Sequence, residues 1–283
     1  MTFGHIRVSN RSREQTPETY MQQDLRLGQF IAPAQKKEIM DYKDFDKMVN
    51  EVEGKSRRSF APSVSFPALM RKVYVWMTLA MAITGITAYG VATSPAILEM
   101  IFGNKLVFWG LIIAEFGLVF GISGMLNRIS ITTATLMFVL YSVINGTVLS
   151  SIFLVYTMSS IGQVFFITAA TFGAMALIGY TTKTDLTSLG KILFMALIGL
   201  IIATVVNIFV GSTGLQTIVS YLGVLIFVGL TAYDSQKIKM MLMDGDVYDE
   251  GAQKLALIGA LTLYLDFVNL FLYLLRILGK GRD

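Results

Sequence analysis

Long runs without a charged residue constrain this chain more than any other feature of its sequence. No residue is charged from Ile129 to Thr182, and none is charged from Ile192 to Tyr233. A helix needs about 20 mostly apolar residues to cross a bilayer, so each run is too long for one spanning helix and suits two. Spanning helices satisfy their own backbone hydrogen bonds, which lipid cannot do for them. These runs therefore predict an all-α integral membrane protein.

The other apolar segments bring the predicted number of spans to seven. The first segment is broken by Ser94-Pro95, the long uncharged runs are divided by polar clusters, and a last apolar run ends the chain. The predicted spans are Val73–Leu98, Lys105–Leu126, two within Ile129–Thr182 divided at Thr157–Gln163, two within Ile192–Tyr233 divided at Gly211–Gly214, and Leu255–Leu278.

Composition agrees with a membrane protein and excludes several kinds of chemistry. Hydrophobic residues make up 54% of the 283 residues and charged residues only 15%, against about 25% charged in soluble domains. There is no cysteine, and the only histidine, His5, lies outside the predicted spans. Disulfides, thiol nucleophiles, a Ser-His-Asp triad and a histidine-bound metal in the membrane are thereby excluded. We expect neither an enzyme nor a bound cofactor nor a nucleic-acid partner.

Residues 1–66 are polar and are predicted to be a flexible cytoplasmic tail, before a transmembrane domain at 67–279 and a short tail at 280–283. No apolar core follows the basic start, so the tail is not a cleaved signal peptide. Its helical pattern is an apolar stripe with a mildly acidic opposite face, whereas helices on anionic lipid are usually basic there. Docking on a protein surface, or transient helicity in a disordered tail, is expected instead. The stripe consists of Ile39, Tyr42, Phe45, Val49 and Val52.

Basic residues predict the orientation of the bundle. They gather before the first span and in alternate connections, while the opposite connections hold Lys105 and little else. By the positive-inside rule the amino terminus is cytoplasmic. Seven crossings then place the basic C-terminal residues outside, so either that tail is an exception or the last run re-enters; we expect a crossing. The inward group is Arg57, Arg58, Arg71, Lys72, Arg128, Lys183, Lys191, Lys237, Lys239 and Lys254, and the outward residues are Arg276, Lys280 and Arg282.

Two aspartates are the candidate site residues. Asp266 lies near the middle of the last span, where an acidic group costs roughly 2.5–3.5 kcal/mol, so a function is expected of it. Asp234 lies at the cytoplasmic end of the sixth span, and its ordinary interpretation is a helix-end carboxylate that reaches water. If both helices run to the turn at Asp244–Gly251, Asp234 stands about 15 Å and Asp266 roughly 22 Å from it, at 1.5 Å per residue. The two carboxyl groups could therefore share one buried site.

Such a pair has a defined chemistry. Burial disfavours the charged form, and repulsion resists the second ionisation, so the two groups titrate as a unit and one shared proton is a plausible resting state. With no histidine in the spans, the pair is the visible route to pH sensitivity. The fully ionised pair would suit a hard cation, which prefers oxygen ligands.

Three other kinds of residue are weaker candidates. Glu115, in the interior of the second span, is either a hydrogen-bonded structural group or a supporting one. Arg128, close to the cytoplasmic end of that span, is either an orientation charge or a salt-bridge latch to Asp234. Asparagine side chains inside spans are expected to form hydrogen bonds between helices; these are Asn145, Asn207 and Asn269.

Two motifs around the aspartates resemble the Bax inhibitor-1 family, in particular its bacterial members. The motifs are GLTAYDSQKIK and ALTLYLDFVNLFLYLLRILG, and the resemblance extends over Pro67–Gly279 through LFMALIGLIIATVVNIF and GAMALIGYTTKTDL. It implies a seven-helix bundle in which the other six enclose the last helix, and a di-aspartyl pH sensor at Asp234 and Asp266. The family's latch arginine has no direct counterpart: aligned on Glu115, its position holds Leu126, and Arg128 follows two residues later.

The resemblance implies an inner-membrane protein with a pH-sensitive calcium or other cation leak, in which calcium is the transported ion. The alternative is a non-conducting regulator of a membrane-anchored ATP-dependent protease and of membrane-protein quality control. An intramembrane aspartyl protease is disfavoured because Tyr233-Asp234-Ser235 and Leu265-Asp266-Phe267 lack the usual flanking glycine. The expected partners are therefore the lipid bilayer, a cation and, in the alternative, a protease.

Overall fold

The computed structural model describes residues 65–126 and 128–282, so the predicted stripe at Ile39–Val52 lies outside the described part. Within these ranges the chain is helical, with one isolated antiparallel bridge between Tyr156 and Gly281. Seven helices are long and apolar enough to cross a membrane, which confirms the predicted number. The helices are α3 (Phe66–Ala92), α4 (Pro95–Phe102), α5 (Lys105–Met125), α6 (Ile131–Leu149), α7 (Ile152–Val155), α8 (Met158–Thr181), α9 (Thr187–Val210), α10 (Thr213–Leu242) and α11 (Glu250–Leu278).

Side chains that accept hydrogen bonds from free backbone N–H groups mark where most helices begin. Asn104 caps α5, Ser130 caps α6, Thr157 caps α8, Ser212 caps α10 and Asp249 caps α11. The helices α3 and α4 instead start with proline in the first turn, where the missing N–H is not needed.

One predicted boundary was wrong, because the prediction treated a polar cluster as a loop. The cluster predicted as the turn after the third span lies mostly inside α8, since Thr157 is its cap and Ser160 and Gln163 belong to its first turns. The helix α10 continues past Asp234 to Leu242, in agreement with a helix that runs to the turn at Asp244–Gly251. Polar side chains of α10 find hydrogen-bond partners on α8 and on the loop after it, so they do not need to end the helix.

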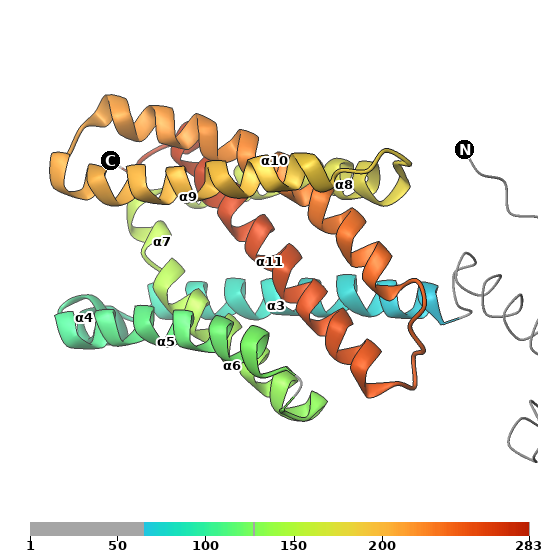
Figure 1. Cartoon of the computed structure of the whole chain (residues 1–283). Coiled ribbons are helices and arrows are strands. Elements are labelled where there is room, and N and C mark those ends of the chain that lie inside the picture. The colour runs from blue at the N-terminus through green and yellow to red at the C-terminus, as the bar shows by residue number, and fades with distance from the viewer. Residues whose placement is uncertain (1–64, 127, 283) are drawn as a thin grey trace, which may run out of the picture. The chain divides into compact units, whose positions relative to one another are not determined.

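The last helix lies between two groups of helices. In Figure 1, α11 crosses diagonally between α3, α5 and α6 on one side and α8, α9 and α10 on the other, and it contacts α3, α6, α8 and α10. Two-thirds (67%) of its most apolar window is buried, against 6% for α5 and for α9. The expectation of a central last helix is therefore confirmed, and the helices that enclose it are α3, α6, α8 and α10.

Two glycines allow close contacts between helices within these groups. A Cβ atom at Gly179 of α8 would overlap the carbonyl oxygen of Ala232 on α10. A Cβ atom at Gly146 of α6 would lie 2.5 Å from the carbonyl oxygen of Thr84 on α3. Small residues that let backbones approach in this way are typical of helix interfaces in membranes, where apolar burial alone drives no association.

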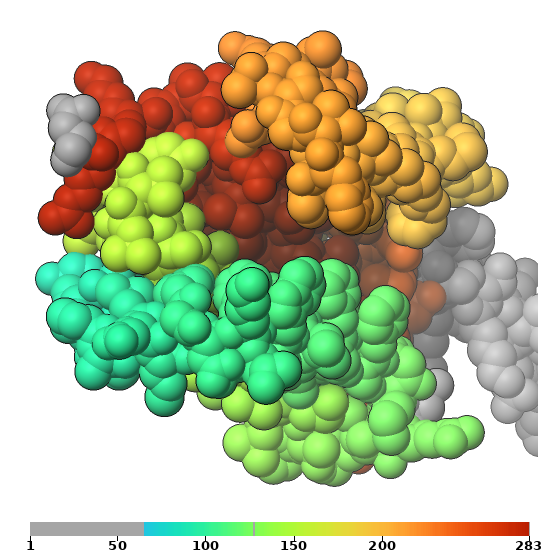
Figure 2. Space-filling view, turned by 90° about the vertical axis from the view of Figure 1, so that its left-hand side faces the viewer, coloured from blue at the N-terminus to red at the C-terminus, as the bar shows by residue number. Residues whose placement is uncertain are grey.

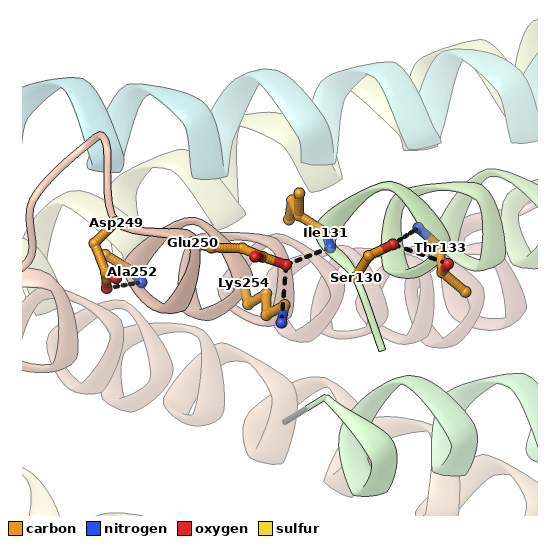
Figure 3. Close-up of polar contacts among 7 residues, drawn as sticks. All are labelled: Ser130, Ile131, Thr133, Asp249, Glu250, Ala252 and Lys254. Carbon is orange, nitrogen blue, oxygen red and sulfur yellow. Dashed lines mark hydrogen bonds and ion pairs between the residues drawn. The ribbon is translucent and has the colours of Figure 1, made fainter. Parts of the chain in front are cut away.

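The start of α11 is joined to the start of α6 by a side chain (Figure 3). One carboxylate oxygen of Glu250 accepts a hydrogen bond of 3.0 Å from the backbone N–H of Ile131 and pairs with Lys254 Nζ at 3.0 Å. Asp249 meanwhile accepts from the N–H of Ala252, which caps α11 itself. One acidic turn thus serves the free N–H groups of two helices.

The two ends of the described chain lie at opposite ends of the bundle. Ser65 donates a hydrogen bond of 3.1 Å to Asp246 in the connection between α10 and α11. At the other end, the residues after α11 pair with the connection before α8: Thr157 N–H donates to the carbonyl of Lys280, and Arg282 N–H to that of Val155. The helix α11 therefore runs through the bundle and does not turn back within it.

Candidate functional site

The two aspartates meet at the contact between α10 and α11. Both side chains are buried, with Asp234 9% and Asp266 5% exposed. The carboxyl groups are hydrogen-bond partners of each other. The antiparallel hairpin therefore brings the two groups to one level, although their distances from the turn along the chain differ.

A hydrogen bond between two carboxyl groups has a simple requirement. An ionised carboxylate carries acceptors only, so one of the two groups must hold a proton for the bond to exist. The second oxygen of Asp266, Oδ2, is buried and has no hydrogen-bond partner among the described residues. A pair that shares one proton leaves Asp266 Oδ2 as an unpartnered oxygen, and gain or loss of that proton would change this arrangement.

The turn of α10 that follows Asp234 is fixed to α8 and to the loop after α8. Ser235 donates to the carbonyl of Ala176 at 2.8 Å, and Lys239 Nζ donates to the carbonyl of Tyr180 at 2.7 Å. The Gln236 amide bonds the loop twice: its oxygen accepts from the N–H of Leu186 and its nitrogen donates to the carbonyl of Thr184.

Sequence reasoning missed this set of contacts because it treated Lys239 only as an orientation charge. The signal was present: a run of polar residues directly after Asp234, in a segment that keeps helical apolar spacing through Ile238 and Leu242. These contacts hold the Asp234 side of the pair in place.

Glu115 lies on α5, away from the aspartates, and belongs to a second polar cluster. Its oxygen Oε1 accepts a hydrogen bond of 2.9 Å from Asn145 Nδ2 on α6, and Asn145 Oδ1 accepts one of 2.9 Å from the Tyr264 hydroxyl on α11. The predicted interhelical hydrogen bond is therefore confirmed for Asn145. It was wrong for Asn207, which accepts from Ser212 N–H at the end of its own helix, and for Asn269, which donates to Leu265 of its own helix.

The structure does not bring Arg128 to the aspartates. Its side chain is exposed, and within residues 65–126 and 128–282 it forms no ion pair. Asp234 is instead hydrogen-bonded to Asp266. Arg128 as a salt-bridge latch to Asp234 remains a prediction.

No dedicated metal site is evident around the aspartates. In the part of the chain that the structure describes, no three histidine, cysteine, aspartate or glutamate side chains come together in a way that could hold an ion. Three cavities of about 290 to 410 Å³ are each lined by one of the basic residues Arg276 and Arg282, and none of the three reaches either aspartate.

The surface at the end of the bundle where α4 lies is hollowed between the two groups of helices. Figure 2 shows α5 and α6 facing α9 and α10 across this hollow, with α11 at a deeper level between them. The last turns of α11 are less buried than its middle, since Arg276 and Leu278 are exposed and Asp266 is buried.

The sequence is similar to proteins of several bacteria. The inner membrane protein YbhL of Escherichia coli (strain K12) is 48% identical over 222 residues, which cover 78% of this chain and 95% of that protein. An uncharacterized protein of Borreliella burgdorferi is 48% identical over 216 residues, covering 76% of this chain and 92% of that protein. The uncharacterized protein RP147 of Rickettsia prowazekii is 44% identical over 220 residues, covering 76% and 90%.

A family model matches nearly the whole described part of the chain. The model, described as inhibitor of apoptosis-promoting Bax1, covers residues 67–283 and so includes all seven spanning helices and both aspartates. The match begins where the polar tail ends, which agrees with the resemblance predicted over Pro67–Gly279 from the motifs. This chain is therefore a multi-pass membrane protein that belongs to the Bax inhibitor-1 family.

Proposed function

We propose that the Asp234–Asp266 pair couples protonation to a change in the contact between α10 and α11, and that this change controls passive cation flux across the membrane. The observation that carries the proposal is the hydrogen bond between the two buried carboxyl groups. When both groups are ionised, the bond is lost and two like charges face each other away from water, which disfavours the same packing. The α10–α11 contact therefore depends on the number of protons that the pair holds.

Calcium is the cation we propose, because carboxylate oxygens are the ligands that a hard divalent cation prefers. Two carboxylates supply fewer oxygens than the roughly six to eight of a stable calcium site. The pair is therefore better suited to brief contact with a passing ion than to stable binding of an ion. The hollow above α11 in Figure 2 supports an approach from that end of the bundle.

We also infer the setting of the protein from its relatives and its charges. The E. coli relative is named an inner membrane protein, and we propose the same location here, with residues 1–66 in the cytoplasm. The basic residues Arg71 and Lys72 in the first turns of α3 support this orientation by the positive-inside rule.

The test is calcium flux into liposomes that contain the purified protein, measured at several pH values. We expect a flux that varies with pH in the unmodified protein and a flattened pH dependence in Asp234→Asn and in Asp266→Asn. Because the two groups act as one unit, the double variant should do little more than the stronger single variant. Glu99→Gln is a matched control, since it removes an exposed carboxylate on α4.

Two results would contradict the proposal in different ways. Additive effects of the two substitutions would mean two independent sites and no shared proton. A folded protein that passes no cation at any pH would exclude a leak and would favour the alternative function, a non-conducting regulator that binds a membrane-anchored protease.

A further inference from the structure

A second polar attachment holds α11 on the face opposite the aspartate pair. The Tyr264 side chain is fully buried, and its hydroxyl lies 2.7 Å from Thr84 Oγ1 on α3 and 2.9 Å from Asn145 Oδ1 on α6. Tyr264 and Asp266 are two residues apart, which corresponds to about 200° around a helix. The same turn of α11 is therefore bonded to α10 on one side and to α3 and α6 on the other.

The donors and acceptors of Glu115, Asn145 and Tyr264 set the direction of the hydrogen bonds that join α5, α6 and α11. The carboxyl oxygen of Glu115 accepts from the nitrogen of the Asn145 amide, so the amide oxygen faces α11 and accepts from the Tyr264 hydroxyl. The Thr84 hydroxyl lies within reach of both Tyr264 and the carbonyl of Ser142, at 2.7 and 3.0 Å. Glu115 thus stands at the acceptor end of a chain that begins at α11.

The surroundings of Tyr264 hold it in one orientation. The rings of Phe138 and Tyr141 on α6 pack edge-on against its ring, with centroids 5.9 and 5.8 Å away. The close contact of Gly146 with the backbone of Thr84 brings α3 and α6 together at this level. An aromatic side chain enclosed in this way can lose its hydroxyl without losing its position, which makes the hydrogen bonds separately testable.

Glu115 is the carboxyl group in this series of hydrogen bonds, so its charge can change by gain or loss of a proton. The titratable groups that interact with it are Tyr141 on α6 and Tyr264 on α11. Among the described residues no lysine, arginine or second carboxylate forms a pair with it. A hydrogen bond to an ionised carboxylate is roughly twice as strong as one to a neutral acceptor, so protonation of Glu115 weakens the bond from Asn145 and, through it, the chain to Tyr264.

We propose that Glu115, Asn145 and Tyr264 form a second proton-responsive attachment, which holds α11 against α5 and α6 independently of the aspartate pair. The inference rests on the proposed function in that both attachments act on the movement of α11. It adds a second titratable site and makes Tyr264 the residue that positions the turn carrying Asp266. Release of α11 from one group of helices need not release it from the other.

The test is a pair of distance measurements with spin labels. The chain has no cysteine, so cysteine pairs can be introduced at partly or fully exposed positions without removing any. Leu140 on α6 with Leu278 on α11 reports the Tyr264 side, and Tyr221 on α10 with Leu278 reports the aspartate side; the three side chains are 50%, 47% and 56% exposed in the order Leu140, Leu278, Tyr221. Both distances are measured in lipid bilayers at neutral and at acidic pH.

Three variants define the expected result for the Leu140–Leu278 pair. In the unmodified protein the distance distribution broadens on acidification. Glu115→Gln keeps an acceptor oxygen but no charge, so it should give the broad distribution at both pH values. Tyr264→Phe keeps the ring and removes the hydroxyl, so it should also be broad at both. Tyr141→Phe is the matched control, because the Tyr141 hydroxyl takes no part in these hydrogen bonds, and it should behave as the unmodified protein.

The double variant Asp234→Asn/Asp266→Asn separates this inference from the proposed function. If the second attachment is independent, the Leu140–Leu278 pair keeps its pH response in this background while the Tyr221–Leu278 pair loses any response. A Leu140–Leu278 distribution that is unchanged by pH, or unchanged by Glu115→Gln and Tyr264→Phe alike, overturns the inference. A response on the Tyr264 side with none on the aspartate side of the unmodified protein supports the inference and contradicts the proposed function alone.

Discussion

The helices α9 and α11 are both apolar enough to cross a membrane, but α9 is mostly exposed and α11 is mostly buried in the bundle. The mean hydropathy of the most apolar window is 2.7 for α9 and 2.0 for α11, yet 6% of that window is buried in α9 and 67% in α11. The polar side chains account for the difference. Asn207 of α9 bonds to Ser212 at the end of its own helix, whereas Tyr264 and Asp266 of α11 bond to other helices. Hydropathy places a helix in the membrane, and polar and small residues decide which helix is enclosed.

Glycines on the two kinds of helix surface provide the largest expected contrast. We expect Gly179→Ala to destabilise the protein by about 3 kcal/mol, the upper end for overpacking, because the new Cβ would overlap the Ala232 carbonyl on α10. Gly199→Ala on α9 has open space around it and should cost nothing measurable. Unfolding in mixed detergent micelles measures both, and equal effects would mean that α9 is packed against protein and not exposed to lipid.

Substitution of large apolar residues should show the same contrast between α11 and α9, with a smaller change in the free energy of unfolding. Leu263 of α11 is completely buried, and Ile202 of α9 is 59% exposed. Leu263→Ala should lower the free energy of unfolding by about 2 kcal/mol, because it leaves a cavity. This value is at the low end for a buried leucine, since the unfolded helix also lies in an apolar environment. Ile202→Ala should change the free energy of unfolding little, since lipid fills the space. A large loss at Ile202 would show that a further copy or partner covers α9.

The start of α9 gives the smallest predicted effect. The N–H of Thr187 donates to Asp185 Oδ1 at 2.8 Å, and hydrogen bonds from the Thr187 side chain and backbone hold the pKa of this exposed carboxyl below its ordinary value. The stabilisation is therefore present at neutral pH and lost as the pH falls through the lowered pKa. Asp185→Ala should lower the melting temperature slightly at neutral and mildly acidic pH alike.

A matched variant separates the charge of Asp185 from its role as an acceptor. Asp185→Asn keeps an oxygen for the N–H of Thr187 and removes the ionisable group. Its small destabilisation relative to the unmodified protein should be the same at neutral and mildly acidic pH, and should disappear as the pH falls through the lowered pKa of Asp185. If Asp185→Ala and the unmodified protein instead diverge between neutral and mildly acidic pH, another group near the start of α9 titrates in that range.

The sequence by itself determined the membrane class, the seven spans, the two aspartates as the candidate site and the family. Uncharged runs that are longer than one membrane crossing allow few folds other than a bundle of spanning helices. A carboxylate inside a spanning helix is rare, so Asp266 is evident from the sequence. The motifs around Asp234 and Asp266 then gave the expectation that α11 is enclosed, which hydropathy does not contain.

Only the tertiary structure decided how the polar residues are paired. Gln236, Ser235 and Lys239 turned out to bond α8 and its loop, and Asn145 proved to join Glu115 to Tyr264, whose sequence position is 119 residues away. Spacing along one helix fixes which side chains share a face, but the partner of each face depends on which helix packs there and at what level. A hydroxyl or amide can be satisfied by its own backbone, as in Asn269, or by another helix, as in Asn145, and the packing of the helices chooses between them.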